Sequence, residues 1–225
     1  MTATSATTSP KETRRRRKND PESVRADILA VATREFSEKG LSGARIDEIA
    51  EKTRASKRMI YYYFSDKETL YLHTLEAAYQ KVRLQEAELD LDHLAPLDAL
   101  CRLVRFTFCH HAKNPDFIRL VMIENIHHGR FLAQSELIQS LNAGVIDVLG
   151  DVYLRGVATG CFREGLDPRE LHWLISALSF FNVSNQHTFA RIFDWQQAAP
   201  ENQQKLEDHV TDMVLRYVRV DRVAP

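Results

Sequence analysis

Helix-start signals spread along the whole chain limit this sequence to one class of fold. The pairs Asp20-Pro21, Asn114-Pro115 and Asp167-Pro168 each place an Asx cap before a proline, whose fixed φ suits the first helical position. No segment alternates β-branched and polar residues between turn signals, as a half-buried strand does. We therefore expect an all-α protein.

The expected helices divide into a compact N-terminal unit and a larger bundle. The first runs from Asp20-Pro21 to Gly40, where a left-handed glycine ends it, and buries Ile28, Ala32 and Phe36 on one face. Ser65 and Glu68 have the spacing of a capping box for the fourth helix. We expect the remaining helices at about 46–52, 56–64, 96–113, 115–128, 131–158 (one piece or two), 168–186 and 202–219, with the fourth ending near Glu88.

Charge is unevenly distributed, although the net charge is only −1. Residues 1–70 carry 15 Lys and Arg against 11 Asp and Glu, and the rest carry 15 against 20. The basic excess is densest at Lys11 and in the run Arg14, Arg15, Arg16, Arg17 and Lys18. Such a run beside a folded unit suggests attraction to a polyanion, and a solubilising tail is the alternative. We expect residues 1–19 to form a disordered basic tail.

Composition excludes several classes of protein. We find no apolar run near the ~20 residues of a membrane span and no apolar signal sequence within residues 1–10, and so expect no membrane partner. Three cysteines without CxxC spacing predict neither a disulfide framework nor a zinc ribbon, which fits a reducing cytoplasm. The eight glycines argue against a Gly-rich nucleotide-binding enzyme. We expect no cofactor and no metal, because adjacent pairs such as His127-His128 diverge by about 100° on a helix.

Two short expected helices, 46–52 and 56–64, have the lengths and spacing of a helix-turn-helix unit that places its second helix in the DNA major groove. Ala50 provides the small residue where the two helices cross. Ser56, Lys57, Arg58, Tyr61 and Tyr62 supply a polar, cationic face, and Lys67 begins the next helix, whose free amides favour a phosphate. The basic run would lie along adjacent backbone or in a minor groove.

These segments resemble the tetracycline-repressor (TetR) family of bacterial transcription regulators. The resemblance is dense over residues 25–75 and includes Phe36 to Gly40, Ile46 to Ala50 and the string SKRMIYYYFSDKETL from Ser56 to Leu70. It implies that Arg45 contacts phosphate, that Lys57 and Arg58 face bases, and that Tyr61, Tyr62 and Lys67 hold the DNA backbone. Two positions depart from the family pattern: Arg54 replaces a common turn glycine, for which we expect a left-handed backbone, and Tyr63 replaces a common histidine.

The resemblance also implies a helix-turn-helix domain at residues 20–70 and a ligand-binding and dimerisation domain at 71–225. It implies a homodimer made by the last two helices, which reads a palindromic double-stranded DNA operator. Apolar stripes on those helices agree with this, and the intramolecular core is the alternative. The stripes comprise Leu171, Leu174, Ile175, Leu178 and Phe181, then Leu206, Val210, Met213, Val214, Tyr217 and Val218.

A small-molecule effector is the third implication. Polar residues gather between Arg119 and Arg130, and aromatic residues that could cover a flat ligand lie on the other helices. Arginine favours an acidic ligand. The string from Glu124 to Arg130 resembles a segment of family members that sense aromatic or heterocyclic acids, which implies a ligand of that kind. The expected ligand-binding residues are Arg105, Phe106, Arg119, Glu124, Asn125, His128, Trp173 and Phe181.

Two alternatives remain open at the level of the sequence. One is a DNA-binding regulator controlled by a protein partner, for which a sealed apolar second domain would argue. The other is an enzyme using the His and Glu residues of the bundle, for which no Ser/His/Asp order, phosphate loop or carboxylate pair is present. We expect no catalytic residues and no enzyme.

Overall fold

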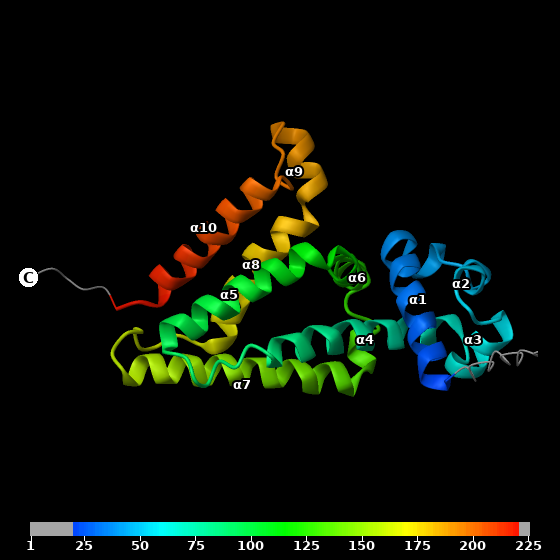
Figure 1. The fold of residues 1–225 in the computed structure, drawn as a ribbon, viewed down its shortest axis with the longest axis horizontal. Coiled ribbons are helices and arrows are strands. Elements are labelled where there is room, and N and C mark those ends of the chain that lie inside the picture. Colours follow the sequence, from blue (N-terminus) through cyan, green and yellow to red (C-terminus); the bar gives the residue numbers. More distant parts are fainter. Residues whose placement is uncertain (1–19, 221–225) are drawn as a thin grey trace, which may run out of the picture.

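The computed structural model describes residues 20–220, and in that range every regular element is a helix (Figure 1). The elements are α1 (Pro21–Gly43), α2 (Ile46–Lys52), α3 (Lys57–Phe64), α4 (Lys67–Ala87), α5 (Pro96–Lys113), α6 (Pro115–Ile126), the 3-10 turn η1 (Leu132–Gln134), α7 (Glu136–Ala158), α8 (Pro168–Ser184), α9 (Gln186–Phe193) and α10 (Pro200–Val218). The all-α prediction is confirmed.

Helices α1 to α3 and the start of α4 form a small unit at one end of the molecule (Figure 1). Ile28, Ala32 and Phe36 are fully buried, as their spacing predicts. The core of this unit also takes in Leu120 of α6 and Phe131 from the turn before η1. The small unit and the bundle therefore share one hydrophobic core at their junction.

The bundle comprises α5 to α10 with the second half of α4, and α5 packs on α7, α8 and α10. The second core lies among these helices and includes Leu100, Val104, Leu149 and Phe162. The stripes on α8 and α10 contribute to it directly: Leu171, Ile175, Val210, Val214 and Val218 are buried within the single chain. Phe181, Met213 and Tyr217 remain exposed on the same helices.

Gly40 interrupts the first helix with the predicted positive φ of 68°, and a short helical stretch follows this kink to Gly43. Two local predictions are wrong. The capping residue of α4 is Asp66, whose carboxylate accepts from the Thr69 amide at 2.7 Å, because Ser65 adopts φ 59° and ends α3. Helix α9 lies in a segment for which no helix is predicted, and Asn185 before it makes no side-chain capping bond.

Helix α7 corrects a third expectation. It is 23 residues long with a mean hydropathy of 1.2 over its most apolar window, so by length and composition alone it could cross a membrane. The expectation that no segment reaches this limit is therefore wrong. In this fold α7 packs against α4, α5 and α8, and Leu149 and Val152 are buried there.

Candidate DNA-binding surface and effector cavity

The predicted DNA-contacting residues lie on and around α3. Ser56 caps this helix, its hydroxyl accepting from the Met59 amide at 3.3 Å. Arg58 and Tyr62 are exposed, Tyr62 at 83%, whereas Ile60 and Phe64 on the opposite face are buried in the core. An amphipathic α3 therefore presents a polar and aromatic face to the outside.

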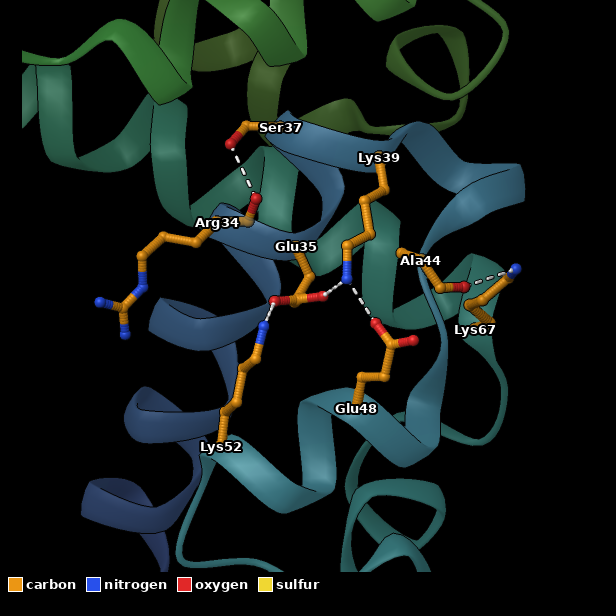
Figure 2. Close-up of polar contacts among 8 residues, drawn as sticks. All are labelled: Arg34, Glu35, Ser37, Lys39, Ala44, Glu48, Lys52 and Lys67. Carbon is orange, nitrogen blue, oxygen red and sulfur yellow. Dashed lines mark hydrogen bonds and ion pairs between the residues drawn. The ribbon is translucent and has the colours of Figure 1, made fainter.

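Of three basic residues of this surface, two have partners within the protein. The Lys57 ammonium lies 2.7 Å from the Asp47 carboxylate, which raises the Lys57 pKa. The Lys67 ammonium donates to the Ala44 carbonyl oxygen at 3.2 Å, at the turn before α2 (Figure 2). Arg45 is exposed at the cap position of α2. All three cations lie at the surface where α2, α3 and α4 begin.

Arg54 is not left-handed, contrary to the expectation drawn from the glycine it replaces, since it is absent from the positive-φ residues of the described range. Its amide instead donates to the Asp27 carboxylate at 3.0 Å, and its guanidinium lies 3.6 Å from the same group. This contact joins the turn to α1. The expected tail contacts of Arg14, Arg15, Arg16 and Arg17 lie outside the described residues.

A buried carboxylate fixes α2 against α1. Glu35 is 2% exposed and accepts hydrogen bonds from Lys39, at 2.7 Å, and from Lys52. Lys39 also bonds Glu48, so the four side chains form one network (Figure 2). The bonds from Lys39 and Lys52 lower the Glu35 pKa. The network ties the end of α2, Lys52, to the middle of α1.

A cavity of about 340 Å³ lies within the bundle, between α4, α5, α6, α7 and α8. We call it the effector cavity. Its walls are largely aromatic, with a few polar groups, as is usual for small-molecule sites. The lining residues are Tyr79, Arg83, Glu86, Phe106, Thr107, His110, His111, Phe117, Val121, Asn125, Asn142, His172, Trp173, Ser176, Ala177 and Phe180.

The polar groups of the effector cavity are held in uncharged or paired states. Arg83 and Glu86 form an ion pair, yet the Arg83 Nε is buried without a hydrogen-bond partner within residues 20–220. Burial lowers the pKa of His110 to about 4 and also lowers the pKa values of His111 and His172. The three imidazoles are thus neutral near pH 7. His111 donates from Nδ1 to the Thr107 carbonyl oxygen at 2.6 Å and has only an acceptor left, whereas both ring nitrogens of His110 are without a hydrogen-bond partner within residues 20–220.

Three of the eight residues predicted for a ligand line this cavity: Phe106, Asn125 and Trp173. Phe181 is 50% exposed and turns its ring toward Phe189 of α9. His128 lies in the turn after α6 with φ 57°, outside the cavity lining.

The charged members of the predicted set are engaged elsewhere. Arg105 pairs with Glu207 and Asp208 of α10, at 2.7 Å each, and Arg119 lies 3.9 Å from Asp116. Glu124 is 1% exposed and accepts from the Tyr71 hydroxyl at 3.0 Å and from two backbone amides after α6 at 3.1 Å. A carboxylate so fully bonded holds α4 to α6.

Several lining residues were not in the predicted set. Tyr79, Arg83 and Glu86 share one face of α4, at spacings of four and three, and this pattern is also that of an ordinary amphipathic helix. His172 and Ser176 repeat the spacing on α8. The one feature of the sequence that could have pointed to these lining residues is the presence of an Arg and a Glu on the inward face of a helix. Within residues 20–220 no three His, Cys, Asp or Glu side chains are placed to hold a metal ion.

Comparison with known proteins agrees with both halves of this arrangement. Residues 28–74 match the family described as bacterial regulatory proteins, tetR family, and residues 96–214 match the tetracyclin repressor-like C-terminal domain. The chain is 32% identical over 196 residues to the HTH-type transcriptional repressor NicS of Pseudomonas putida, covering 87% of this chain and 92% of that protein.

Two Streptomyces coelicolor proteins are also similar. The HTH-type transcriptional repressor SCO4008 is 34% identical over 171 residues, covering 73% of this chain and 80% of that protein. The crystal structure of the transcriptional regulator SCO4942 superimposes with a TM-score of 0.66 at 27% identity, covering 87% of this chain and 98% of that one.

Proposed function

The chain belongs to the TetR family of bacterial transcription regulators, and from that premise we propose that it is a homodimeric repressor of a palindromic operator. A small organic molecule in the effector cavity releases it. The observation that carries the release step is a shared wall: α4 and α6 line the effector cavity and also pack on α1 of the DNA-reading unit. A ligand that shifts either helix therefore moves the unit that reads DNA.

DNA reading is assigned to residues 20–70 and to the tail at 1–19. Lys57 and Arg58 face base edges, and Ser56 and Tyr61 lie beside them on the same helix. Arg45, Tyr62 and Lys67 hold the phosphate backbone, together with Arg14, Arg15, Arg16 and Arg17. The exposure of Arg58 and Tyr62 on one face of α3 supports this division.

Effector binding and dimerisation are assigned to residues 71–225. The effector is a planar aromatic or heterocyclic acid: Phe106, Phe117 and Trp173 cover its rings, and its carboxylate competes with Glu86 for Arg83. The neutral imidazoles bond its heteroatoms. These polar linings favour a small molecule over control by a protein partner alone.

The dimer is formed by α8 and α10. Its support is the apolar surface left after the chain has folded, since Phe181, Met213 and Tyr217 are 41% to 56% exposed. Exposed large apolar residues on adjacent helices mark an interaction surface. The protein acts in the cytoplasm, where its operator is located.

The proposal is tested first by selecting bound duplexes from a random pool with the purified protein at moderate salt. We expect a palindromic consensus with half-sites separated by one helical turn or a multiple of it. Retention of DNA without a consensus contradicts the operator proposal.

The selected duplex then serves as the probe for a release screen with aromatic and heterocyclic acids. A ligand should quench Trp173 fluorescence and release the duplex. Ser176→Trp, which fills the effector cavity, should bind the duplex but no longer release it. Ala198→Trp, on an exposed loop, is the matched control and should respond as the unmodified protein does. Release from the Ser176→Trp variant at unchanged ligand concentration places the effector elsewhere.

A further inference from the structure

A second cavity, of about 370 Å³, lies at the junction of the DNA-reading unit and the bundle. We call it the junction cavity. It is bounded by α1, the middle of α4, and the corner where α5 ends and α6 begins. Its floor is apolar, with Leu29 and Ala30 from α1, Val82 from α4 and Phe117 from α6. The effector cavity lies on the other side of His110 and Phe117, which line both.

Cations dominate the polar part of the junction cavity. Arg34, Lys81 and Lys113 come from three different helices, against one carboxylate, Asp116. Within residues 20–220 none of the three cations forms an ion pair, and Figure 2 shows the Arg34 side chain extending away from the Glu35 network. Asp116 is occupied by the Ser37 hydroxyl at 3.1 Å. The three cations are exposed at the rim of the cavity, and the Lys81 ammonium donates to the Asn114 side-chain oxygen at 3.1 Å. Three cations against one carboxylate leave an excess of positive charge, which favours an anion.

His110 supplies an independent sign that a ligand belongs here. It is 5% exposed, and neither ring nitrogen has a hydrogen-bond partner within residues 20–220. Buried polar atoms are nearly always bonded, so an unbonded imidazole in a cavity wall marks a place where a ligand atom can bond. The α6 helix also begins at this corner, where backbone amides attract negative charge.

We propose that the junction cavity binds a small organic anion with an apolar body, such as an aromatic carboxylate, at a site separate from the effector cavity. The carboxylate lies among Arg34, Lys81 and Lys113, and the apolar body lies on Leu29 and Phe117. A molecule in this place contacts α1 and the bundle at once. Its binding energy therefore depends on the angle between them, and its occupancy favours one orientation of the DNA-reading unit.

The test is calorimetric titration of the full-length protein with benzoate and with benzamide, its uncharged counterpart. Benzoate should bind more tightly than benzamide, and the double variant Lys81→Gln, Lys113→Gln should bind benzoate about tenfold more weakly or worse. Ser176→Trp, with the effector cavity filled, should keep one benzoate site of unchanged affinity. Lys205→Gln, an exposed lysine of α10, is the control for general charge loss.

Four results overturn the proposal. They are equal binding of benzoate and benzamide, no benzoate binding by the unmodified protein, equal affinity in the Lys81→Gln, Lys113→Gln variant, and loss of every benzoate site in Ser176→Trp. The last places the anion in the effector cavity and leaves the repressor proposal intact. If inorganic phosphate bound as tightly as benzoate, the apolar floor of the cavity would add nothing to affinity, which would contradict the proposed apolar half of the site. Thermal unfolding of each variant verifies that it is folded.

Discussion

At the scale of single residues, the basic side chains of the DNA-reading surface differ in whether they form hydrogen bonds or ion pairs within the protein. Arg58 is exposed on α3, and no ion pair or hydrogen bond holds its side chain within residues 20–220. Lys67 closes a turn through the Ala44 carbonyl. An Arg58 side chain without a partner suits the proposed contact to base edges, and a Lys67 held by Ala44 suits the proposed contact to the phosphate backbone.

Arg58→Ala should lower the preference for particular base pairs by about 1–3 kcal/mol each, because it removes a base-edge contact. Lys67→Ala should weaken binding to every sequence and reduce the slope of log affinity against log salt by about 1. Anisotropy titrations against the selected operator and its single-base variants measure both. Lys205→Ala, far along α10, is the control. Identical behaviour of Arg58→Ala and Lys67→Ala would contradict the division of roles.

We expect His110 to make the free energy of unfolding depend on pH. Its pKa of about 4 lies below the usual value of 6.5, so the unfolded chain binds more protons between these limits and stability falls as pH drops through them. At about pH 5 the loss amounts to roughly 2 kcal/mol. His110→Leu should remove it, so urea unfolding at about pH 7 and about pH 5 should differ less than in the unmodified protein.

His187→Leu, on an exposed position of α9, is the matched control and should keep the full pH dependence. An unchanged difference between the two pH values in His110→Leu would show that another group is responsible.

The site residues show how far sequence reasoning reaches. Phe106 and Trp173 could be predicted because large aromatic residues on bundle helices often cover ligands. Arg105 and Glu124 could not be separated from them, since both are charged residues in apolar helices and only the fold shows their partners, Glu207 and Tyr71. The rotation of each helix about its own axis decides whether a polar residue faces a ligand or another helix, and the sequence does not give this rotation.

At the scale of elements, some helix starts were predicted to the residue and others were not: α7 begins at Glu136 instead of 131, and α10 begins at Pro200 instead of 202. α5 and α8 begin as expected, because proline admits few positions in a helix. α9 has no such start: the residue before it makes no capping bond, and of its eight residues five are exposed and none is fully buried. Ser65 was assigned to the wrong helix because a serine can either begin one helix or end another, and tertiary contacts decide.

Two glycines of α7 test how tightly that helix packs. A Cβ added to Gly156 would lie 1.9 Å from the buried Phe162 ring, whereas one added to Gly144 meets nothing within 4 Å. Gly156→Ala should therefore destabilise the protein by about 1–3 kcal/mol through overpacking. Gly144→Ala, the control on the same helix, should stabilise it by roughly 0.5–1 kcal/mol. Urea unfolding measures both, and equal effects would contradict the packing of α7 on Phe162.

At the scale of the whole molecule, the apolar surface of α8 and α10 should decide the oligomeric state. Phe181→Glu combined with Met213→Glu places two charges on it and should yield monomers in sedimentation velocity, with loss of operator binding. Leu84→Glu, at an equally exposed position on α4, should leave the assembly unchanged. If the double variant sediments as the unmodified protein does, α8 and α10 are not the interface.

The core shared by the two halves has a consequence for protein engineering. Leu120 and Phe131 complete the core of the DNA-reading unit, and Tyr71 of α4 bonds Glu124 of α6. A chimera that joins residues 20–64 of this chain to a foreign sensor would expose that core, because Tyr71, Leu120 and Phe131 would be absent from it. A workable crossover point must transfer α4 as far as Tyr79 together with α6 and Phe131. The DNA-reading unit of this protein can therefore be moved to another protein only together with the α4 and α6 segments that complete its core.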